Sequence, residues 1–128
     1  MRIALVLCLA LSPTPAAALD LNSFRAQHGR PALSLSVELS GIASTKAREL
    51  ADRRRLDHSG FRERARTRRS ASAENVAFGC DTEDCVIRMW SRSAGHRRNM
   101  LMGGITAYGI ASATGGNGRT YWALELGN

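Results

Sequence analysis

Hydrophobic residues recur at helical spacing between positions 36 and 55 of the chain. Their separation of three or four residues places them on one face of an α-helix, with polar residues on the opposite face. Ser36 stands before this pattern and is a favourable N-cap residue. We therefore predict a long amphipathic helix that begins after Ser36, ends near Arg55 and buries one face. Its apolar positions are Leu39, Ile42, Ala43, Ala47, Leu50 and Ala51.

Shorter helical segments are predicted on both sides of this long helix. Leu21 and Phe24 are spaced for a helical turn, and Gly29-Arg30-Pro31 then stops the helix near His28. A cation at a helix C-terminus suits the helix dipole, so we leave His28 out of the candidate site. Residues 61–68 are mostly polar and predict either a short helix or an ordered loop.

A further helix is predicted after Thr82. Threonine is a common N-cap, and acidic residues follow it where the helix dipole favours them. Met89 and Trp90 lie on the apolar face of this helix, so we expect Trp90 to belong to the core. Ala94-Gly95 is predicted to break the helix, with Gly95 allowing a tight turn and His96 opening the next turn.

Strands are predicted where hydrophobic and polar residues alternate with a period of two. The segment ENVAFG at 74–79 is the first, and residues 105–113 and 120–126 are the other two. The glycine-rich residues 114–119 join the last two strands as a hairpin. The order of helices and strands predicts an α+β fold in which helices cover an antiparallel sheet.

The first 18 residues have the order of a secretory signal peptide: a basic start, a short apolar run and small residues. The apolar run at 3–11 is too short to span a bilayer, which takes about 20 residues. A buried N-terminal helix is the alternative reading. We expect cleavage near Ala18, a secreted product in an extracellular or periplasmic space, and one domain at 19–128 with no transmembrane segment.

Cleavage would remove Cys8 and leave Cys80 and Cys85 as a nearby pair. In an oxidising compartment such a pair predicts a structural disulfide. Two sulfurs alone make a poor zinc site, and the spacing differs from that of redox motifs. We therefore predict a Cys80–Cys85 disulfide bond.

The chain carries a formal net charge of +7, concentrated in arginines at 53–55 and 62–69. A basic surface attracts anionic partners such as a cell-envelope polymer or an anionic lipid. A solvated arginine-rich face without a partner is the other interpretation. Aromatic residues are few and do not alternate with the arginines, so we do not expect nucleic-acid binding.

Three polar residues at the ends of predicted elements are candidates for chemistry: His58, Glu74 and His96. Two imidazoles and a carboxylate could hold a divalent metal with water in the fourth place. They could also form a hydrogen-bonded cluster that titrates near neutral pH. Spacing alone does not bring the three together, and each could instead be a separate polar residue.

Five motifs occur along the chain after the leader: HSG at 58–60, AENVAFG at 73–79, MWSRSAGHRRNML at 89–101, YGIA at 108–111 and YWALELG at 121–127. Taken together, they resemble the CAP superfamily. This family is named after cysteine-rich secretory proteins, antigen 5 and pathogenesis-related 1 proteins, and its domain is also called the SCP domain. The resemblance covers nearly all of the chain after the leader and is greatest to the short bacterial branch. It implies a three-layer α-β-α sandwich with a central antiparallel sheet.

The resemblance also implies a central cavity lined by His58, Glu74 and His96. Many eukaryotic members have a second glutamate at the position that Ser93 occupies in this sequence. The cavity therefore has one negative charge fewer, and zinc at His58 and His96 would be held less firmly. Asn75 is expected to brace neighbouring backbone rather than to contact a ligand.

Three functions follow from these residues. The first is a secreted, monomeric binding module for a lipid, a metal ion or a cell-envelope component in the His/Glu cavity. The second is an extracellular hydrolase, either metal-dependent or with Ser93 or Ser59 as nucleophile and a cavity histidine as base. No nucleophile-elbow motif surrounds either serine. The third, compatible with the first, is electrostatic attachment of the arginines to an anionic polymer.

Overall fold

The computed structural model describes residues 17–66 and 72–128. The apolar run of the predicted leader lies outside these residues, as do Arg68 and Arg69 of the second arginine cluster. Within the described ranges, none of the helices has the length and hydropathy needed to cross a membrane.

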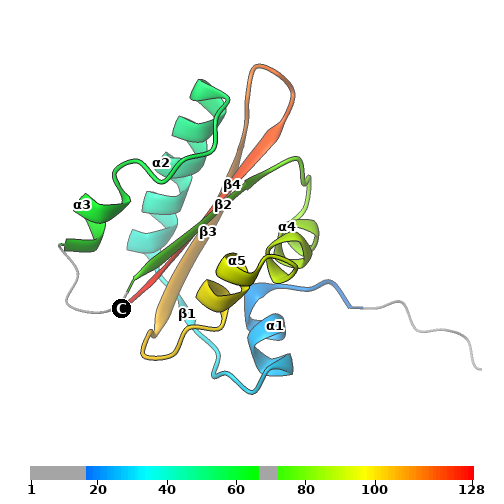
Figure 1. Ribbon diagram of the computed structural model, residues 1–128, viewed down its shortest axis with the longest axis vertical. Helices are drawn as coiled ribbons and strands as arrows, with labels where there is room; N and C mark the ends of the chain where they lie inside the picture. Colours follow the sequence, from blue (N-terminus) through cyan, green and yellow to red (C-terminus); the bar gives the residue numbers. More distant parts are fainter. Residues whose placement is uncertain (1–16, 67–71) are drawn as a thin grey trace, which may run out of the picture.

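A central sheet lies between two helical layers (Figure 1). Helices α2 and α3 lie on one side of the sheet, and α1, α4 and α5 lie on the other. This arrangement confirms the predicted three-layer α-β-α sandwich. The elements are α1 (Leu21–Gln27), β1 (Ser34–Leu35), α2 (Val37–Arg53), α3 (Phe61–Arg66), β2 (Ala73–Phe78), α4 (Glu83–Ser91), α5 (Ala94–Met100), β3 (Ala107–Thr114) and β4 (Thr120–Gly127).

The strand order is β1-β3-β4-β2. The pairs β3–β4 and β4–β2 are antiparallel, as predicted, and β1 adds a short parallel pairing to β3. Strand β1 was not predicted because two exposed residues, Ser34 and Leu35, are too few to show a period. Strand β2 is at the edge of the sheet, which matters for the site described below.

Each face of the sheet has its own hydrophobic cluster. One cluster lies on the side of α1, α4 and α5 and includes the fully buried Trp90, together with Trp122. The other lies under α2 and includes Ala43, Ala47 and Leu50. Helix α2 can approach β3 closely because Gly109 has no side chain: a Cβ there would lie 2.2 Å from the backbone of Leu39.

Two predicted helix caps are confirmed. The Ser36 side chain accepts a hydrogen bond from the backbone N–H of Leu39, and the Thr82 side chain accepts one from that of Cys85. The predicted disulfide is also confirmed, since Cys80 and Cys85 are bonded with their Cα atoms 5.6 Å apart. It joins the chain just after β2 to the first turn of α4.

One local prediction was wrong. Ala94 and Gly95 do not break a helix; they begin α5, and the interruption falls at Arg92 and Ser93. Ser93 takes an extended conformation (φ −109°, ψ 122°), which ends one helix and provides the N-cap position of the next. The orientation of His96 therefore comes from its place in the first turns of α5, not from a turn at Gly95.

Candidate functional site

His58 and Glu74 form one hydrogen-bonded pair. His58 lies in the loop after α2, and Glu74 projects from β2 with its side chain fully buried. The distance from His58 Nδ1 to Glu74 Oε1 is 2.8 Å. An ionised carboxylate can only accept, so Nδ1 carries the hydrogen and Nε2 is left for a ligand. The His58 side chain is 52% exposed, so it remains accessible from solvent.

Glu74 also has an acidic neighbour, Glu125, which was not among the predicted site residues. Glu125 of β4 lies directly opposite it in the β2–β4 register, and its side chain is also fully buried. The guanidinium of Arg64, on α3, bonds Glu74 Oε2 and lies 3.5 Å from Glu125 Oε1. An acidic residue within the otherwise apolar run YWALEL was the signal for Glu125, but its partner depends on strand register.

Opposing influences set the charge of Glu74. Burial raises the pKa of this carboxyl, but hydrogen bonds with Glu125 and His58, together with the positive charges of Arg64 and Lys46, hold its pKa below the usual value. Glu74 is therefore ionised at neutral pH. Its negative charge is already balanced within the protein.

A second ion pair fixes the loop that carries His58. Lys46 of α2 is buried, and its Nζ lies 3.1 Å from Asp57 Oδ1 and 3.1 Å from the Ser59 carbonyl oxygen. Hydrogen bonds from Ser59 and Lys46 hold the pKa of Asp57 well below its usual range. Lys46 thus fixes Asp57 and Ser59, the residues immediately before and after His58. Lys46 was not predicted as part of the site because its position on α2 looks like an ordinary polar one.

Two hydrogen-bonded asparagines, Asn75 and Asn99, hold the backbone of His96. The side-chain amide of Asn75 donates to the His96 carbonyl oxygen at 3.0 Å, and that of Asn99 donates to Asn75 Oδ1 at 2.9 Å. Both contacts agree with the bracing role predicted for Asn75. The His96 ring centroid lies 6.4 Å from that of Trp90.

The two histidines influence each other. Burial and the charge of His58 lower the pKa of His96 below its ordinary value, so its imidazole is neutral at pH 7. The structure thus brings His58 and Glu74 into direct contact and places His96 within electrostatic range. Ser93 lies on the same side as His96, and its side chain makes no capping hydrogen bond in the described structure.

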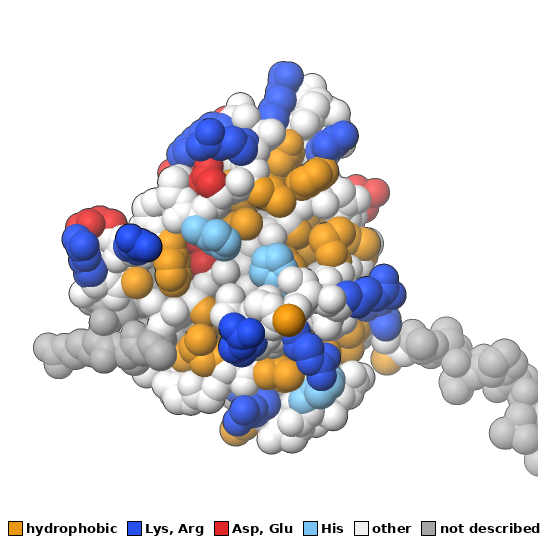
Figure 2. Space-filling view, viewed as in Figure 1, with side chains coloured by type: hydrophobic (Ala, Val, Ile, Leu, Met, Phe, Trp, Pro, Cys, Tyr) orange, Lys and Arg blue, Asp and Glu red, His pale blue; other side chains and the backbone are white. Residues whose placement is uncertain are grey.

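An apolar groove adjoins these residues. Its volume is about 400 Å³, and Ser93 and His96 lie among its lining residues. Figure 2 shows two histidine side chains near the centre of one face, with hydrophobic side chains gathered above and beside them. We call the apolar groove that includes Ser93 and His96 the β2-edge groove. Its other lining residues are Leu56, Val76, Ala77, Phe78, Met89 and Trp90.

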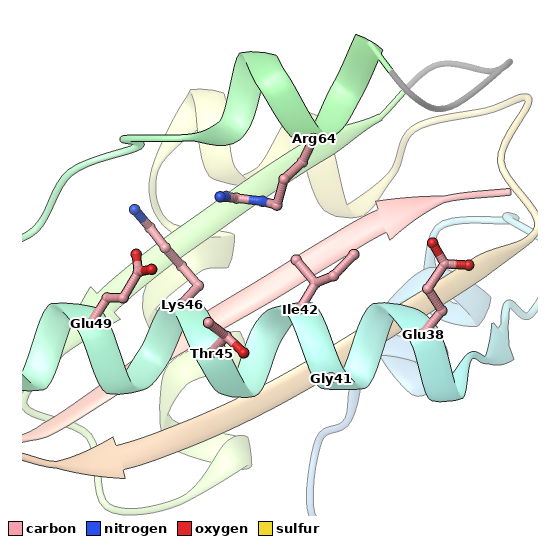
Figure 3. Close-up of a pocket in the computed structure, with 7 residues that line it drawn as sticks. All are labelled: Glu38, Gly41, Ile42, Thr45, Lys46, Glu49 and Arg64. Atoms are coloured by element: carbon pink, nitrogen blue, oxygen red, sulfur yellow. The ribbon is translucent and has the colours of Figure 1, made fainter.

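A second cavity of about 410 Å³ lies between α2 and α3. Lys46 and Arg64 extend into the space between the two helices, and Glu38 lies toward the beginning of α2 (Figure 3). Side chains of both charges line this α2–α3 cavity. Arg64 lines this cavity and also bonds Glu74, so the cavity adjoins the Glu74 pair.

The donor set fits a firmly held metal poorly. In the described part of the chain, no group of three histidine, cysteine, aspartate or glutamate residues is arranged to hold an ion. Glu74 already uses one oxygen for His58 and the other for Arg64. Zinc in proteins usually has three or four protein ligands, and the two imidazoles provide only two.

One curated relative is a longer bacterial protein. YkwD of Bacillus subtilis (strain 168), an uncharacterized protein, is 26% identical over 104 residues, which cover 75% of this chain. Those residues are 40% of YkwD, so the chain spans about two fifths of the length of this curated relative.

Solved structures show the same fold. An outer surface protein from Borrelia burgdorferi has a TM-score of 0.72 at 16% identity, over 84% of this chain and 86% of its own. An extracellular protein containing a SCP domain from Bacillus anthracis has a TM-score of 0.68 at 18% identity, over 84% of this chain and 38% of its own.

The family model of the cysteine-rich secretory proteins matches residues 20–126. It therefore covers the domain from the cap of α1 to the last residues of β4. The match agrees with the motifs around His58, Glu74 and His96 and with the sandwich fold. This chain belongs to the CAP superfamily, the cysteine-rich secretory protein family.

Proposed function

We propose that this protein is an extracellular binding module that holds its ligand at His58 and His96 and in the β2-edge groove. The observation that carries the proposal is the state of Glu74. Both of its oxygens are engaged within the protein, one by His58 and one by Arg64. It is thereby suited to orient His58 rather than to react or to hold an ion.

The polar and apolar parts of the site adjoin each other. His58 is exposed, and His96 stands at the groove lined by Leu56, Phe78 and Met89. A ligand with one polar end and one apolar part would contact both. This combination favours a lipid-like or envelope-derived molecule over a free metal ion.

The arginines beside the site favour an anionic ligand. Arg53 and Arg55 lie just before His58 and are exposed, and each pairs with an acidic neighbour, Glu49 or Asp57. Positive charge at the rim raises the rate at which anionic molecules arrive, an effect that salt weakens. An anionic envelope polymer is the partner class that fits this rim.

The hydrolase alternative receives less support. A nucleophilic serine needs a general base within hydrogen-bond reach. The described structure shows no hydrogen bond from Ser93 to His96, and Ser59 instead bonds Lys46 and Arg53. His58, the histidine that has an orienting carboxylate, has Glu74 as its bonded partner and no serine.

Ring NMR of the three histidines tests the proposal. The probe is octyl phosphate, an anion with one polar end and one apolar part, used below its micelle-forming concentration. If His58 and His96 form one site, their ring resonances shift together along a single binding curve. His28 provides an internal control, because it lies just after α1 and its Nδ1 contacts the Phe24 carbonyl oxygen at 2.8 Å. Independent curves for His58 and His96, or an equal response of His28, would show that the pair is not a joint binding centre.

A further inference from the structure

We propose that a groove beside helix α5 binds a linear polymer with repeated phosphodiester groups, such as a polyol-phosphate polymer of a cell envelope. The groove has a volume of about 580 Å³ and lies between α5 and the loop that follows α1. We call it the arginine groove. The inference goes beyond the proposed function, because no histidine lines this surface in the described structure. The residues that line it include Arg30, Ala94, Arg97, Arg98, Leu101 and Met102.

Helix α5 contributes to two different surfaces. Its residues in the arginine groove are spaced by three or four positions, so they share one face of the helix. His96 lies between them in sequence but lines the β2-edge groove. The two surfaces are therefore made of different residues, and each can be altered without changing the other. The groove residues of the helix are Ala94, Arg97, Arg98 and the C-cap residue Leu101.

The protein does not neutralise the positive charge of this groove. Within the described residues, none of Arg30, Arg97 and Arg98 forms an ion pair, and no acidic side chain lines the groove. Over α5 and the loop after α1, Figure 2 shows basic side chains next to hydrophobic ones and no acidic side chain. Arg53 and Arg55 differ, because each pairs with an acidic neighbour. The charge of the arginine groove is thus available to an external anion.

Contacts beneath the groove hold its two sides together. Arg25 of α1 is buried, and its Nη1 donates to the carbonyl oxygens of Met100 at 2.9 Å and Met102 at 3.0 Å. These bonds tie α1 to the end of α5. Arg97 is half-buried, with its guanidinium carbon 5.5 Å from the centroid of the Phe24 ring on α1. The groove is therefore formed before a ligand arrives, which reduces the entropy lost on binding.

Arg25 adds positive charge below the surface. Its third hydrogen bond goes from Nε to the Pro31 carbonyl oxygen, so within the described structure its partners are carbonyl groups and not carboxylates. Burial and the positive charge of Arg30 lower the pKa of Arg25. The two guanidinium groups therefore repel each other, and an anion bound at Arg30 would relieve this repulsion.

The cations in the groove favour phosphate groups. All three are arginines, whose planar guanidinium group binds phosphate or carboxylate through two parallel hydrogen bonds. They come from two segments of the chain, the loop after α1 and helix α5. A tetrahedral phosphate directs its oxygens in several directions and can accept from both segments, whereas the oxygens of a carboxylate lie in one plane.

The shape of the groove favours a chain over a small molecule. None of its lining residues is fully buried, so it cannot enclose most of a ligand. A polymer that crosses the groove can place successive phosphates at the arginines and its carbon units on Leu101 and Met102. No aromatic side chain lines the groove within the described residues, so nucleic-acid bases would have no ring to stack on.

Calorimetry with poly(glycerol phosphate) at several salt concentrations tests the inference, with the whole chain after the predicted leader. Arg30→Gln with Arg98→Gln removes two exposed cations and leaves Arg97 packed on Phe24. We expect this double variant to weaken binding about tenfold or more. The slope of log K against log salt should become less negative by about 0.7 for each lost contact. Unchanged affinity and slope would overturn the inference.

Arg48→Gln with Arg54→Gln is the matched control. Both arginines are exposed, and neither forms an ion pair within the described residues. They lie on α2 and at its end, on the other side of the sheet, so the control loses the same charge away from the groove. We expect an affinity change of less than about twofold. An equal loss in the two double variants would show that binding follows net charge alone, and would overturn the groove assignment.

Two further polyanions test the chemistry of the ligand, each compared at equal charge. Poly-L-glutamate carries carboxylates, and we expect it to bind more weakly than poly(glycerol phosphate). Equal or tighter binding of poly-L-glutamate would overturn the assignment to phosphate. Oligothymidylate carries phosphodiesters together with bases. Tighter binding of oligothymidylate than of poly(glycerol phosphate) would assign the groove to nucleic acid and overturn the envelope polymer.

The outcomes separate this inference from the proposed function. If the groove variant loses the polymer and the histidine rings do not respond to octyl phosphate, the arginine groove stands and the proposed function fails. If the histidine rings respond together and the groove variant binds the polymer as the unaltered protein does, the proposed function stands and the arginine groove is wrong.

Discussion

Glu74 and Glu125 lie directly opposite each other on β2 and β4, and both side chains are fully buried. Two carboxyl groups in directly opposed strand positions would destabilise the sheet if both were ionised. The guanidinium of Arg64 compensates for this by reaching both carboxyl groups from α3. No α3 side chain is fully buried, so this contact is a main tie between the helix and the sheet.

Replacing Arg64 with methionine should therefore destabilise the protein strongly. Removal of Arg64 leaves the buried Glu74 carboxylate without the charge and the hydrogen bond of the guanidinium, at a cost of about 3 kcal/mol. Urea unfolding followed by circular dichroism gives the change in the free energy of unfolding. Arg66→Met is the control, because Arg66 is on the same helix and 76% exposed, and we expect less than about 0.5 kcal/mol. An equal loss in the two variants would contradict the bridging role of Arg64.

The Asn75–Asn99 pair should contribute both to the stability of the fold and to the position of His96. Asn75→Ala removes the side-chain donor to the His96 carbonyl oxygen and the shorter of the two hydrogen bonds made by the Asn99 amide. We expect a loss of about 1–3 kcal/mol. A double-mutant cycle with Asn99→Ala isolates the contact between the two side chains. The ring resonances of His96 report its position. Unchanged resonances in Asn75→Ala would show that Asn75 does not position His96.

The stability of the fold should depend on pH through His96. Burial and the charge of His58 place its folded-state pKa below the ordinary value of about 6.5. The unfolded chain therefore takes up a proton before the folded protein does. The contribution is complete above about pH 6.5 and declines as the pH falls below it. The lowered pKa of Glu74 acts in a more acidic range, below its ordinary value.

Urea unfolding at pH 7.5 and pH 5.5 measures this dependence. His96→Gln removes the titrating group, so the difference in the free energy of unfolding between the two pH values should become smaller. His28→Gln, at the end of α1, is the control and should leave the contribution of His96 in place. A His96→Gln variant with the full difference would assign the pH dependence to other groups.

The predicted cleavage after Ala18 would create an ion pair. The backbone N–H of Leu19 donates to Asp84 Oδ1, and Asp84 also binds Arg88. In a chain that begins at Leu19, this N–H becomes an ammonium group beside the carboxylate. Asp84→Asn should then lower the Tm more in that chain than in one that begins at Ala17. Equal shifts in the two chains would show that the processed terminus does not use Asp84.

The features of the fold that depend on local sequence could be predicted. Ser36 and Thr82 cap helices as their side chains indicate, and the strand at Glu74 begins within one residue of its predicted position. The boundary between α4 and α5 was placed one or two residues too late. The chain leaves the helical conformation at Ser93, which is extended, and no glycine in a left-handed conformation marks that point. Local composition does not distinguish such a bend from a continuous helix.

The site was predictable only in part for a similar reason. The motifs indicate His58, Glu74 and His96, but the partners of Glu74 come from distant parts of the chain. Glu125 depends on the β2–β4 register, and Arg64 depends on where α3 lies over the sheet. The groove also escapes sequence analysis, because its walls come from three elements.

Amide and histidine-ring NMR with octyl phosphate tests the central claim most directly, because it locates the bound ligand. We predict that the amide resonances of Val76 and Phe78 and the ring resonances of His96 shift with one common affinity. The resonances of the α2–α3 cavity, such as those of Thr45, should stay in place. Shifts confined to the α2–α3 cavity, with β2 and His96 unaffected, would contradict the claim that the histidines and the β2-edge groove form the ligand site.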